Sequence, residues 1–145
     1  MPIHGDGGHA AVIKDFVPPS IEGWIIAIGD NATRQRVSRQ YKDFAIAIHP
    51  KAVVSPTAII GEGTVVMAGA VVQARAVIGK HVILNSGCSV DHDCIIEDFA
   101  HIAPGAHICG AVRVGEGALV GVGSCAVPGS QVTPWSVVPG GSVIK

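Results

Sequence analysis

The chain has 145 residues; 48% are hydrophobic, only 4% are aromatic, and the formal net charge is −1 with histidine counted as neutral. This length suits one domain with a small appendage, and a net charge near zero does not indicate a basic surface that binds nucleic acid. No apolar run reaches the roughly 18–20 residues that a membrane-spanning helix needs. The start MPIHGDGGH has neither the basic nor the apolar region of a signal peptide, so a cytoplasmic protein without a membrane span is expected.

Residues 1–45 carry no repeat and predict a reduced α/β segment. In chain order we expect a short apolar stretch at 2–4, a brief helix over 10–15, a buried strand over 24–29 and a helix over about 32–42. Asp30 or Asn31 is placed to cap the second helix. The glycine-rich loop between the first strand and helix can cradle a phosphate, but this signal alone is weak and a tight turn is the favoured interpretation. The basic residues of the second helix could face that phosphate, but a solvated helix face is the expected arrangement: Arg34, Arg36, Arg39 and Lys42.

A period of six dominates the rest of the chain. From Ile48 to Ile144 every sixth residue is Val, Ile or Leu, with Ala126 as the exception, and a small residue or valine follows four positions later. Each unit can form one short strand and one corner, and three units close one triangular coil. Such coils stack about 4.8 Å apart through parallel-strand hydrogen bonds. The pattern predicts a mainly β chain with a parallel β-helix over residues 46–145, whereas an ordinary sandwich would break the register.

Two residue types need a separate reading. Glycine often follows the aliphatic residue directly, as at Gly61 and Gly79, where we expect a corner with positive φ. The four cysteines form no CxxC pair, so we expect buried thiols and neither a disulfide framework nor a zinc ribbon: Cys88, Cys94, Cys109 and Cys125.

The hexad register also predicts which residues stack, because equivalent positions on successive coils are three units apart. His92 lies at a corner between Asp91 and Asp93, where a carboxylate can orient the imidazole for proton transfer. From the residues alone, a solvated surface histidine is the favoured interpretation, and a catalytic one is the alternative. Gly110 should stack on His92. No two histidines of the chain are separated by one full coil, so no metal site within one chain is expected.

The segment Asn85–Ser124, NSGCSVDHDCIIEDFAHIAPGAHICGAVRVGEGALVGVGS, resembles one group of hexapeptide-repeat acyltransferases. These are the sialic-acid O-acetyltransferase-like enzymes and the N-acetyltransferases of nucleotide-linked 4-amino sugars. The resemblance reaches the N-terminus, where GDGGHA and AIGDNATRQRV are similar to that family's nucleotide-binding domain. It implies coils that wind left-handed, acetyl-CoA as co-substrate, and homotrimers with active sites between subunits.

The resemblance also implies the role of each matching residue. His92 matches the general base, Asp93 the acidic neighbour that tunes it, and Gly110 the glycine whose N–H meets the thioester carbonyl. His101 matches a residue that contacts acetyl-CoA, and Asn85 one that lies near the sugar amine. Val122 and Gly140 match positions whose backbone atoms contact the cofactor. Gly7, Gly8 and His9 match the loop that holds the nucleotide-linked sugar.

The expected function is therefore acetyl-CoA-dependent N-acetylation of a nucleotide-linked amino sugar. Sialic-acid-type O-acetylation is the alternative within the family, and a non-catalytic, degenerate binding protein is another. A γ-type carbonic anhydrase is disfavoured because the histidine spacing does not reproduce its three ligands. The sequence departs from the family in two respects. Only eight residues separate Asp15 from Trp24, too few for the further crossover and second strand that the family's nucleotide-binding domain has there. The given sequence also lacks the PAK-type segment of the wider superfamily.

Overall fold

The computed structural model describes residues 2–145, which begin with a small α/β segment. Its elements are β1 (Ile3–His4), α1 (Gly8–Phe16), β2 (Ile25–Ile26) and α2 (Asn31–Ser38). β1 and β2 pair in parallel, and Asp30 caps α2 by accepting a hydrogen bond from the Thr33 N–H at 2.8 Å. The expected order of elements is thus confirmed, although the strand at 24–29 is shorter than predicted and α2 ends four residues early.

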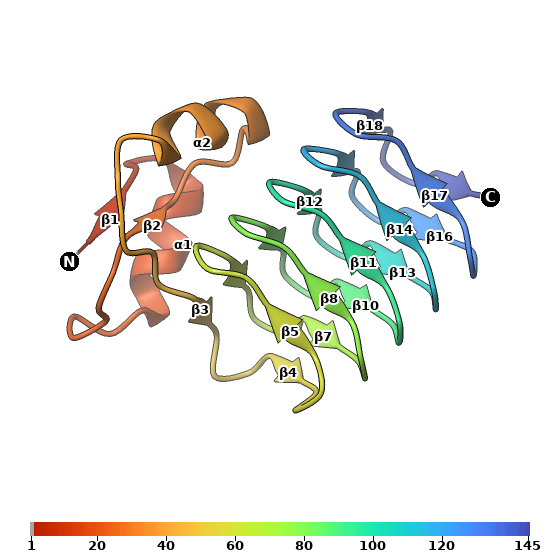
Figure 1. Cartoon of the computed structure of the whole chain (residues 1–145), viewed down its shortest axis with the longest axis horizontal. Helices are drawn as coiled ribbons and strands as arrows, with labels where there is room; N and C mark the ends of the chain where they lie inside the picture. Colours follow the sequence, from red (N-terminus) through yellow and green to blue (C-terminus); the bar gives the residue numbers. More distant parts are fainter. Residues whose placement is uncertain (1) are drawn as a thin grey trace.

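The rest of the chain forms a triangular β-helix with three faces of two-residue strands (Figure 1). The β3 face contains β3 (Ala47–Ile48), β6 (Val65–Val66), β9 (Ile83–Leu84), β12 (His101–Ile102), β15 (Leu119–Val120) and β18 (Val137–Val138). The β4 face contains β4 (Val53–Val54), β7 (Val71–Val72), β10 (Ser89–Val90), β13 (His107–Ile108), β16 (Cys125–Ala126) and β19 (Val143–Ile144). The β5 face contains β5 (Ile59–Ile60), β8 (Val77–Ile78), β11 (Ile95–Ile96), β14 (Arg113–Val114) and β17 (Gln131–Val132).

The register within each face is one full coil of three units, as the repeat predicted. Val90, for example, pairs with Val72 on one side and Ile108 on the other. The second residue of each central strand points inward and is buried, together with the small residue that follows four positions later. Each such aliphatic side chain contributes roughly 1.5–3 kcal/mol of burial as an upper limit. The coils wind left-handed, as the resemblance implied.

The corners correct one expectation about glycine. Positive φ occurs at the third residue after the inward aliphatic, at every sixth position from Gly63 to Gly141. Gly61, which follows its aliphatic residue directly, is not among them. A Cβ there would lie only 2.4 Å from the Gly79 carbonyl oxygen, so close stacking of coils demands glycine, and backbone handedness does not.

The α/β segment packs against the first coils of the β3 face, while the C-terminus lies at the opposite end (Figure 1). Ile13 and Ile25 share a core with Val65 and Met67 of that face. Two cysteine predictions were wrong. Cys125 is exposed and Cys109 half-buried; Cys125 is the outward residue of its strand. Within residues 2–145, no helix has both the length and the apolar character needed to cross a membrane.

Arg34 overturns the expectation of a solvated helix face. Its side chain is only 1% exposed, and its guanidinium donates to four backbone carbonyls and to the Asn31 side chain. The carbonyl acceptors lie on both sides of the junction, in the α/β segment and at two coil corners: Ile28, Gly29, His81 and Phe99. Arg34 therefore fastens the α/β segment to the β-helix, while Arg36, Arg39 and Lys42 are exposed as expected.

Candidate active site

His92 lies on the turn after β10, at the edge between the β4 and β5 faces. Its Nδ1 is 2.8 Å from the Asp93 Oδ2, and its backbone N–H donates to the Asp91 carboxylate at 2.7 Å. The imidazole is about half exposed. An ionised carboxylate only accepts hydrogen bonds, so Nδ1 carries the proton and Nε2 of the neutral ring holds a free lone pair. That nitrogen has no hydrogen-bond partner within residues 2–145.

The Asp93 carboxylate is also held by Arg75, which stacks one coil before it. The Arg75 Nε and Nη2 donate to Oδ1 at 2.7 Å and to Oδ2 at 2.9 Å. The hydrogen bonds from Arg75 and from His92 keep the pKa of Asp93 well below its usual range. Asp93 therefore remains ionised wherever His92 can act as a base. Sequence reasoning missed Arg75, although its separation from Asp93 by one full coil was available to find it.

Gly110 lies directly beneath the His92 ring, one coil further on. A Cβ built at Gly110 would come within 2.6–2.7 Å of the His92 Cε1 and Nε2 atoms. Any larger residue would displace the imidazole, so glycine is what lets the ring occupy this position. The stacking that the register predicted is thus confirmed, and it brings the Gly110 backbone beside the free nitrogen of His92.

The other predicted residues of the β-helix lie away from the His92 corner. Asn85, Val122 and Gly140 are at the edge between the β3 and β4 faces, and His101 is on β12 of the β3 face. Gly140 stacks on Val122, whose side chain is 61% exposed. One chain therefore keeps these residues apart from His92, and the width of the β4 face separates the two edges.

His101 and Asn85 are hydrogen-bonded to each other. The Asn85 side-chain amide contacts the His101 Nε2 at 3.0 Å, and the Asn85 Oδ1 accepts from the Ser86 N–H. His101 also makes a hydrogen bond to the Gly29 backbone, whose carbonyl is shared with Arg34. This chain of contacts connects the α/β segment to the edge that carries Asn85.

Three histidines lie near the positive charge of Arg34: His81 is buried, and His9 and His101 are partly buried. Burial lowers the pKa of His9, His81 and His101 to about 4, and the positive charge of Arg34 adds to this lowering in each case. The His81 ring stacks on Phe99 at 5.1 Å, and its Nδ1 has no partner among residues 2–145, like the Nε2 of His9. These histidines are therefore neutral near pH 7, so they carry no positive charge with which to bind an anion.

Gly7, Gly8 and His9 line a cavity of about 410 Å³ at the start of α1, as do Gly29 and Asp6. No side chain caps this helix, and nothing lies within 4 Å of a Cβ built on either glycine. The first N–H groups of α1 are therefore open to an anionic ligand. The basic residues of α2 do not line this cavity, so it lacks the cationic face that sequence reasoning allowed for.

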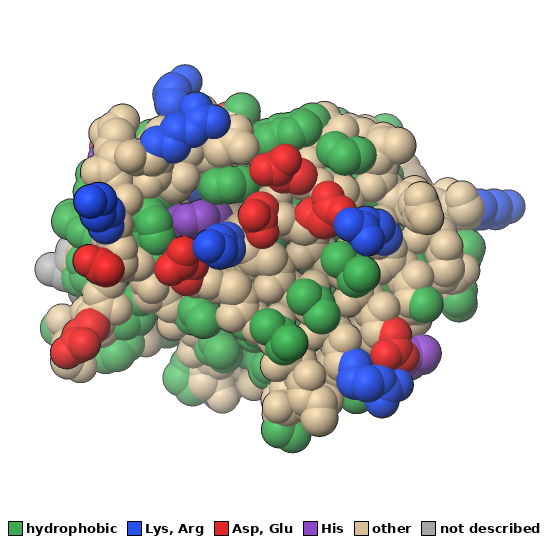
Figure 2. Space-filling model, viewed as in Figure 1, with side chains coloured by type: hydrophobic (Ala, Val, Ile, Leu, Met, Phe, Trp, Pro, Cys, Tyr) green, Lys and Arg blue, Asp and Glu red, His purple; other side chains and the backbone are tan. Residues whose placement is uncertain are grey.

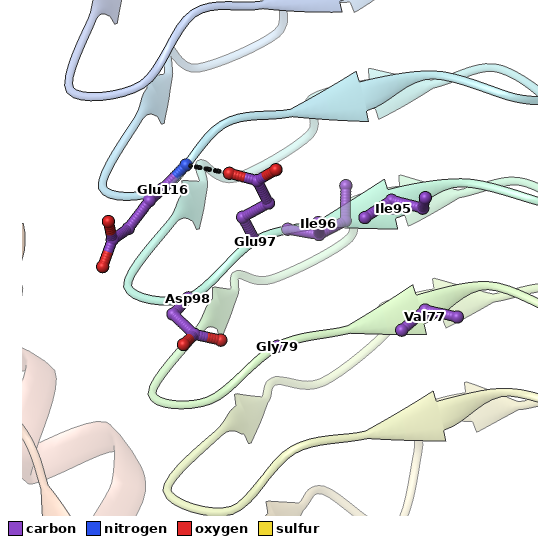
Figure 3. A pocket seen from close by; sticks show the side chains of 7 residues that line it. All are labelled: Val77, Gly79, Ile95, Ile96, Glu97, Asp98 and Glu116. Carbon is purple, nitrogen blue, oxygen red and sulfur yellow. Dashed lines mark hydrogen bonds between the residues drawn. The ribbon is translucent and has the colours of Figure 1, made fainter.

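A different cavity, of about 370 Å³, lies over the β5 face (Figure 3). Glu97, Asp98 and Glu116 line it beside the apolar Val77 and Ile95, and the Glu97 carboxylate accepts a hydrogen bond from the Glu116 N–H. Acidic side chains gather across this region in Figure 2. Its negative charge opposes phosphate-bearing ligands, and none of the predicted site residues reaches it. Among residues 2–145, no group of three or more metal-ligating side chains is assembled.

A left-handed hexapeptide β-helix with a histidine–carboxylate pair at one edge defines a class, the hexapeptide-repeat acyltransferases. No protein-family model matches the chain, and no curated protein matches it by sequence. Solved structures do match. PerB from Caulobacter crescentus, solved with CoA and GDP-perosamine, is 33% identical, with a TM-score of 0.92 over 99% of this chain and 87% of that one.

The acetyltransferase domain of PglB from Neisseria gonorrhoeae, in complex with acetyl coenzyme A, is 32% identical, with a TM-score of 0.88 over 96% of this chain and 87% of that one. A hexapeptide-repeat acetyltransferase from Vibrio cholerae, VCA0836, shares the fold at 19% identity and a TM-score of 0.61, covering 81% and 80% of the two chains. The chain therefore belongs to the hexapeptide-repeat sugar acetyltransferases, with a shortened N-terminal segment.

Proposed function

We propose that the protein transfers the acetyl group of acetyl-CoA to the amino group of a nucleotide-linked amino sugar. The observation that carries this proposal is the His92 imidazole, oriented by Asp93 and lying over Gly110 with its Nε2 free. The related structures are described as an acetyltransferase domain with acetyl-CoA and an N-acetyltransferase with CoA and GDP-perosamine. Acetyl-CoA carries the acetyl group, and the nucleotide-linked amino sugar carries the amino group, that this site would join.

In the proposed reaction, His92 accepts a proton at Nε2 while the sugar nitrogen attacks the thioester carbon. The new C–N bond forms, the C–S bond breaks, and CoA leaves as a thiolate that can take the proton. The Gly110 N–H would donate to the developing oxyanion, an interaction that contributes roughly 2.7–4 kcal/mol in enzymes where it has been removed. Asp93 would stabilise the imidazolium between the two proton transfers.

We assign the nucleotide-linked sugar to the cavity at the start of α1. The uncapped N–H groups beyond Gly7 and Gly8 suit a pyrophosphate, because a helix N-terminus carries partial positive charge. The division into a binding segment over residues 1–45 and an acyltransferase domain over 46–145 is part of the same proposal.

The site requires a second copy of the chain. His92 and Gly110 lie on one edge and Asn85, Val122 and Gly140 on another, so a single chain cannot present all of them to one acetyl-CoA. A neighbour that packs its β3–β4 edge against the β4 face would bring the two sets together, and the exposed Val122 would be covered. A homotrimer repeats this contact three times. We place the reaction in the cytoplasm, where acetyl-CoA and nucleotide-linked sugars meet.

The test is thiol release from acetyl-CoA with a panel of UDP-, dTDP- and GDP-linked amino sugars, followed by mass spectrometry and NMR of the product. We expect turnover with at least one amino sugar and acetylation at nitrogen. Acetylation of a hydroxyl instead would indicate the O-acetyltransferase alternative. Absence of turnover on every acceptor, together with absence of acetyl-CoA binding in calorimetry, would indicate a non-catalytic protein.

A further inference from the structure

The third member of the histidine corner is an arginine from the preceding coil. Arg75 and Asp93 occupy equivalent positions on adjacent coils, and both have a left-handed backbone, with φ of 60° and 59°. Because the backbone conformation is the same at both positions, the two side chains leave the backbone in the same direction. The Arg75 guanidinium then meets both oxygens of Asp93, while Oδ2 is shared with the His92 Nδ1.

We propose that Arg75 is a positioning residue for the acetyl transfer, one that fixes the Asp93 carboxylate so that it in turn fixes the His92 ring. This inference rests on the proposed function of His92. A planar guanidinium binds a carboxylate in a two-point fork that determines the plane of the carboxylate, which a lysine cannot do. Once that plane is fixed, one lone pair of Oδ2 remains directed at the imidazole.

The exposure of this corner is the reason an arginine matters. The side chains of Arg75, His92 and Asp93 are 66%, 55% and 42% exposed in one chain, so contacts within that chain other than their mutual hydrogen bonds do little to restrict their rotamers. An exposed ion pair contributes little to folding stability. The bidentate contact is thus better explained by orientation of the catalytic pair than by stabilisation of the fold.

The remaining titratable groups of the stacked corners do not replace Arg75. Asp91 is engaged with the His92 backbone N–H, and Cys109, on the following coil, carries no charge that could hold Asp93. The Cys94 thiol donates to the Cys109 carbonyl, and burial raises its pKa. Arg75 is therefore the one cation on these corners that contacts the Asp93 carboxylate among the described residues 2–145.

The first experiment separates kcat from KM. Arg75→Gln should lower kcat about tenfold, since a misplaced catalytic group loses rate without losing ligand affinity, while KM for acetyl-CoA stays within about twofold. Arg75→Lys keeps the charge but not the fork, so it should recover only part of the rate. Arg113→Gln is the matched control, because Arg113 on β14 also forms a surface ion pair, with Glu97, away from His92, and its loss should leave kcat unchanged.

A double-mutant cycle tests whether Arg75 acts through Asp93. In the Asp93→Asn background, Arg75→Gln should change kcat by less than about twofold, because the group it positions is already gone. A full additional loss in that background would overturn the proposal. So would a raised KM for acetyl-CoA with unchanged kcat, which would indicate that Arg75 contacts a phosphate of CoA.

A readout without turnover keeps this test separate from the proposed function. Carboxyl ¹³C NMR of Asp93 in the free protein should show a pKa well below the usual range, and Arg75→Gln should raise it toward the ordinary value of about 3.9. An unchanged Asp93 titration would show that the fork does not form in solution. Inactivity of the wild-type protein would instead defeat the proposed function.

Discussion

The two groups of histidines in this protein have opposite surroundings. His92 lies half-exposed on a coil edge beside a carboxylate, whereas His81 is buried and His9 and His101 are partly buried near the positive charge of Arg34. Burial beside a cation favours the neutral ring in the second group, whereas the Asp93 carboxylate orients the His92 ring. The same side chain is therefore prepared for proton transfer in one region and for uncharged hydrogen bonding and packing in the other.

The two regions also differ in the contacts that build them. The His92 corner is built by stacking within the repeat, from residues at equivalent positions of successive coils. The buried group is built by contacts between the α/β segment and the coils, where Arg34 reaches carbonyls of both. We therefore expect substitutions in the first region to affect folding little and substitutions in the second to destabilise the fold.

The largest predicted effect is on activity at His92. His92→Ala should lower kcat by about 10²–10⁴-fold, the usual contribution of a general base, with an unchanged far-UV spectrum and melting temperature. Arg113→Ala is the control, because Arg113 lies on the β5 face, away from both edges of the proposed site, and pairs with Glu97. Full activity of His92→Ala would remove the catalytic assignment.

The second prediction concerns Arg34 and stability. Arg34→Met leaves buried carbonyls without donors, so the free energy of unfolding should fall by roughly 3–5 kcal/mol. Arg36→Met, on the exposed side of the same helix, should change it by less than about 0.5 kcal/mol. Urea denaturation of both variants measures the contrast. Equal stabilities would show that the α/β segment is not fastened by Arg34.

The third prediction is a loss of stability in acid. The pKa of His81 is about 4 in the folded chain and about 6.5 when unfolded, so between these values the unfolded state binds more protons. Stability should therefore fall as the pH drops from about 6.5 to 4, by up to about 3 kcal/mol for this residue. His81→Phe should flatten the slope, since Phe99 occupies the equivalent left-handed corner one coil later. A slope unchanged in His81→Phe, measured by denaturation at several pH values, would contradict this assignment.

The smallest predicted effect is at Gly110. Gly110→Ala places a methyl group within 2.6–2.7 Å of the His92 Cε1 and Nε2 atoms, so the ring must shift. We expect about a tenfold loss of kcat from this misplacement, with the fold retained. Steady-state kinetics at saturating acetyl-CoA measures it, and wild-type kcat would mean that the ring position over Gly110 is not the active one.

Most of the β-helix could be predicted from the sequence because its rule is local. An aliphatic residue every six positions determines which side chains point inward and which residues stack, and so it placed Gly110 beneath His92. The glycines after the aliphatic residues were misread, since close approach between coils cannot be distinguished from positive φ in a sequence. Arg34 was misread because its acceptors are backbone carbonyls far along the chain, which leave no signature in residue types.

The central claim is that the exposed His92 edge and the edge carrying Asn85 complete one site between two copies. Subunit mixing tests it directly: His92→Ala and Asn85→Ala, each nearly inactive alone, are unfolded, combined in equal amounts and refolded together. If each site takes His92 from one copy and Asn85 from its neighbour, random assembly restores about one quarter of wild-type activity. Activity no greater than the mean of the two variants would contradict a shared site.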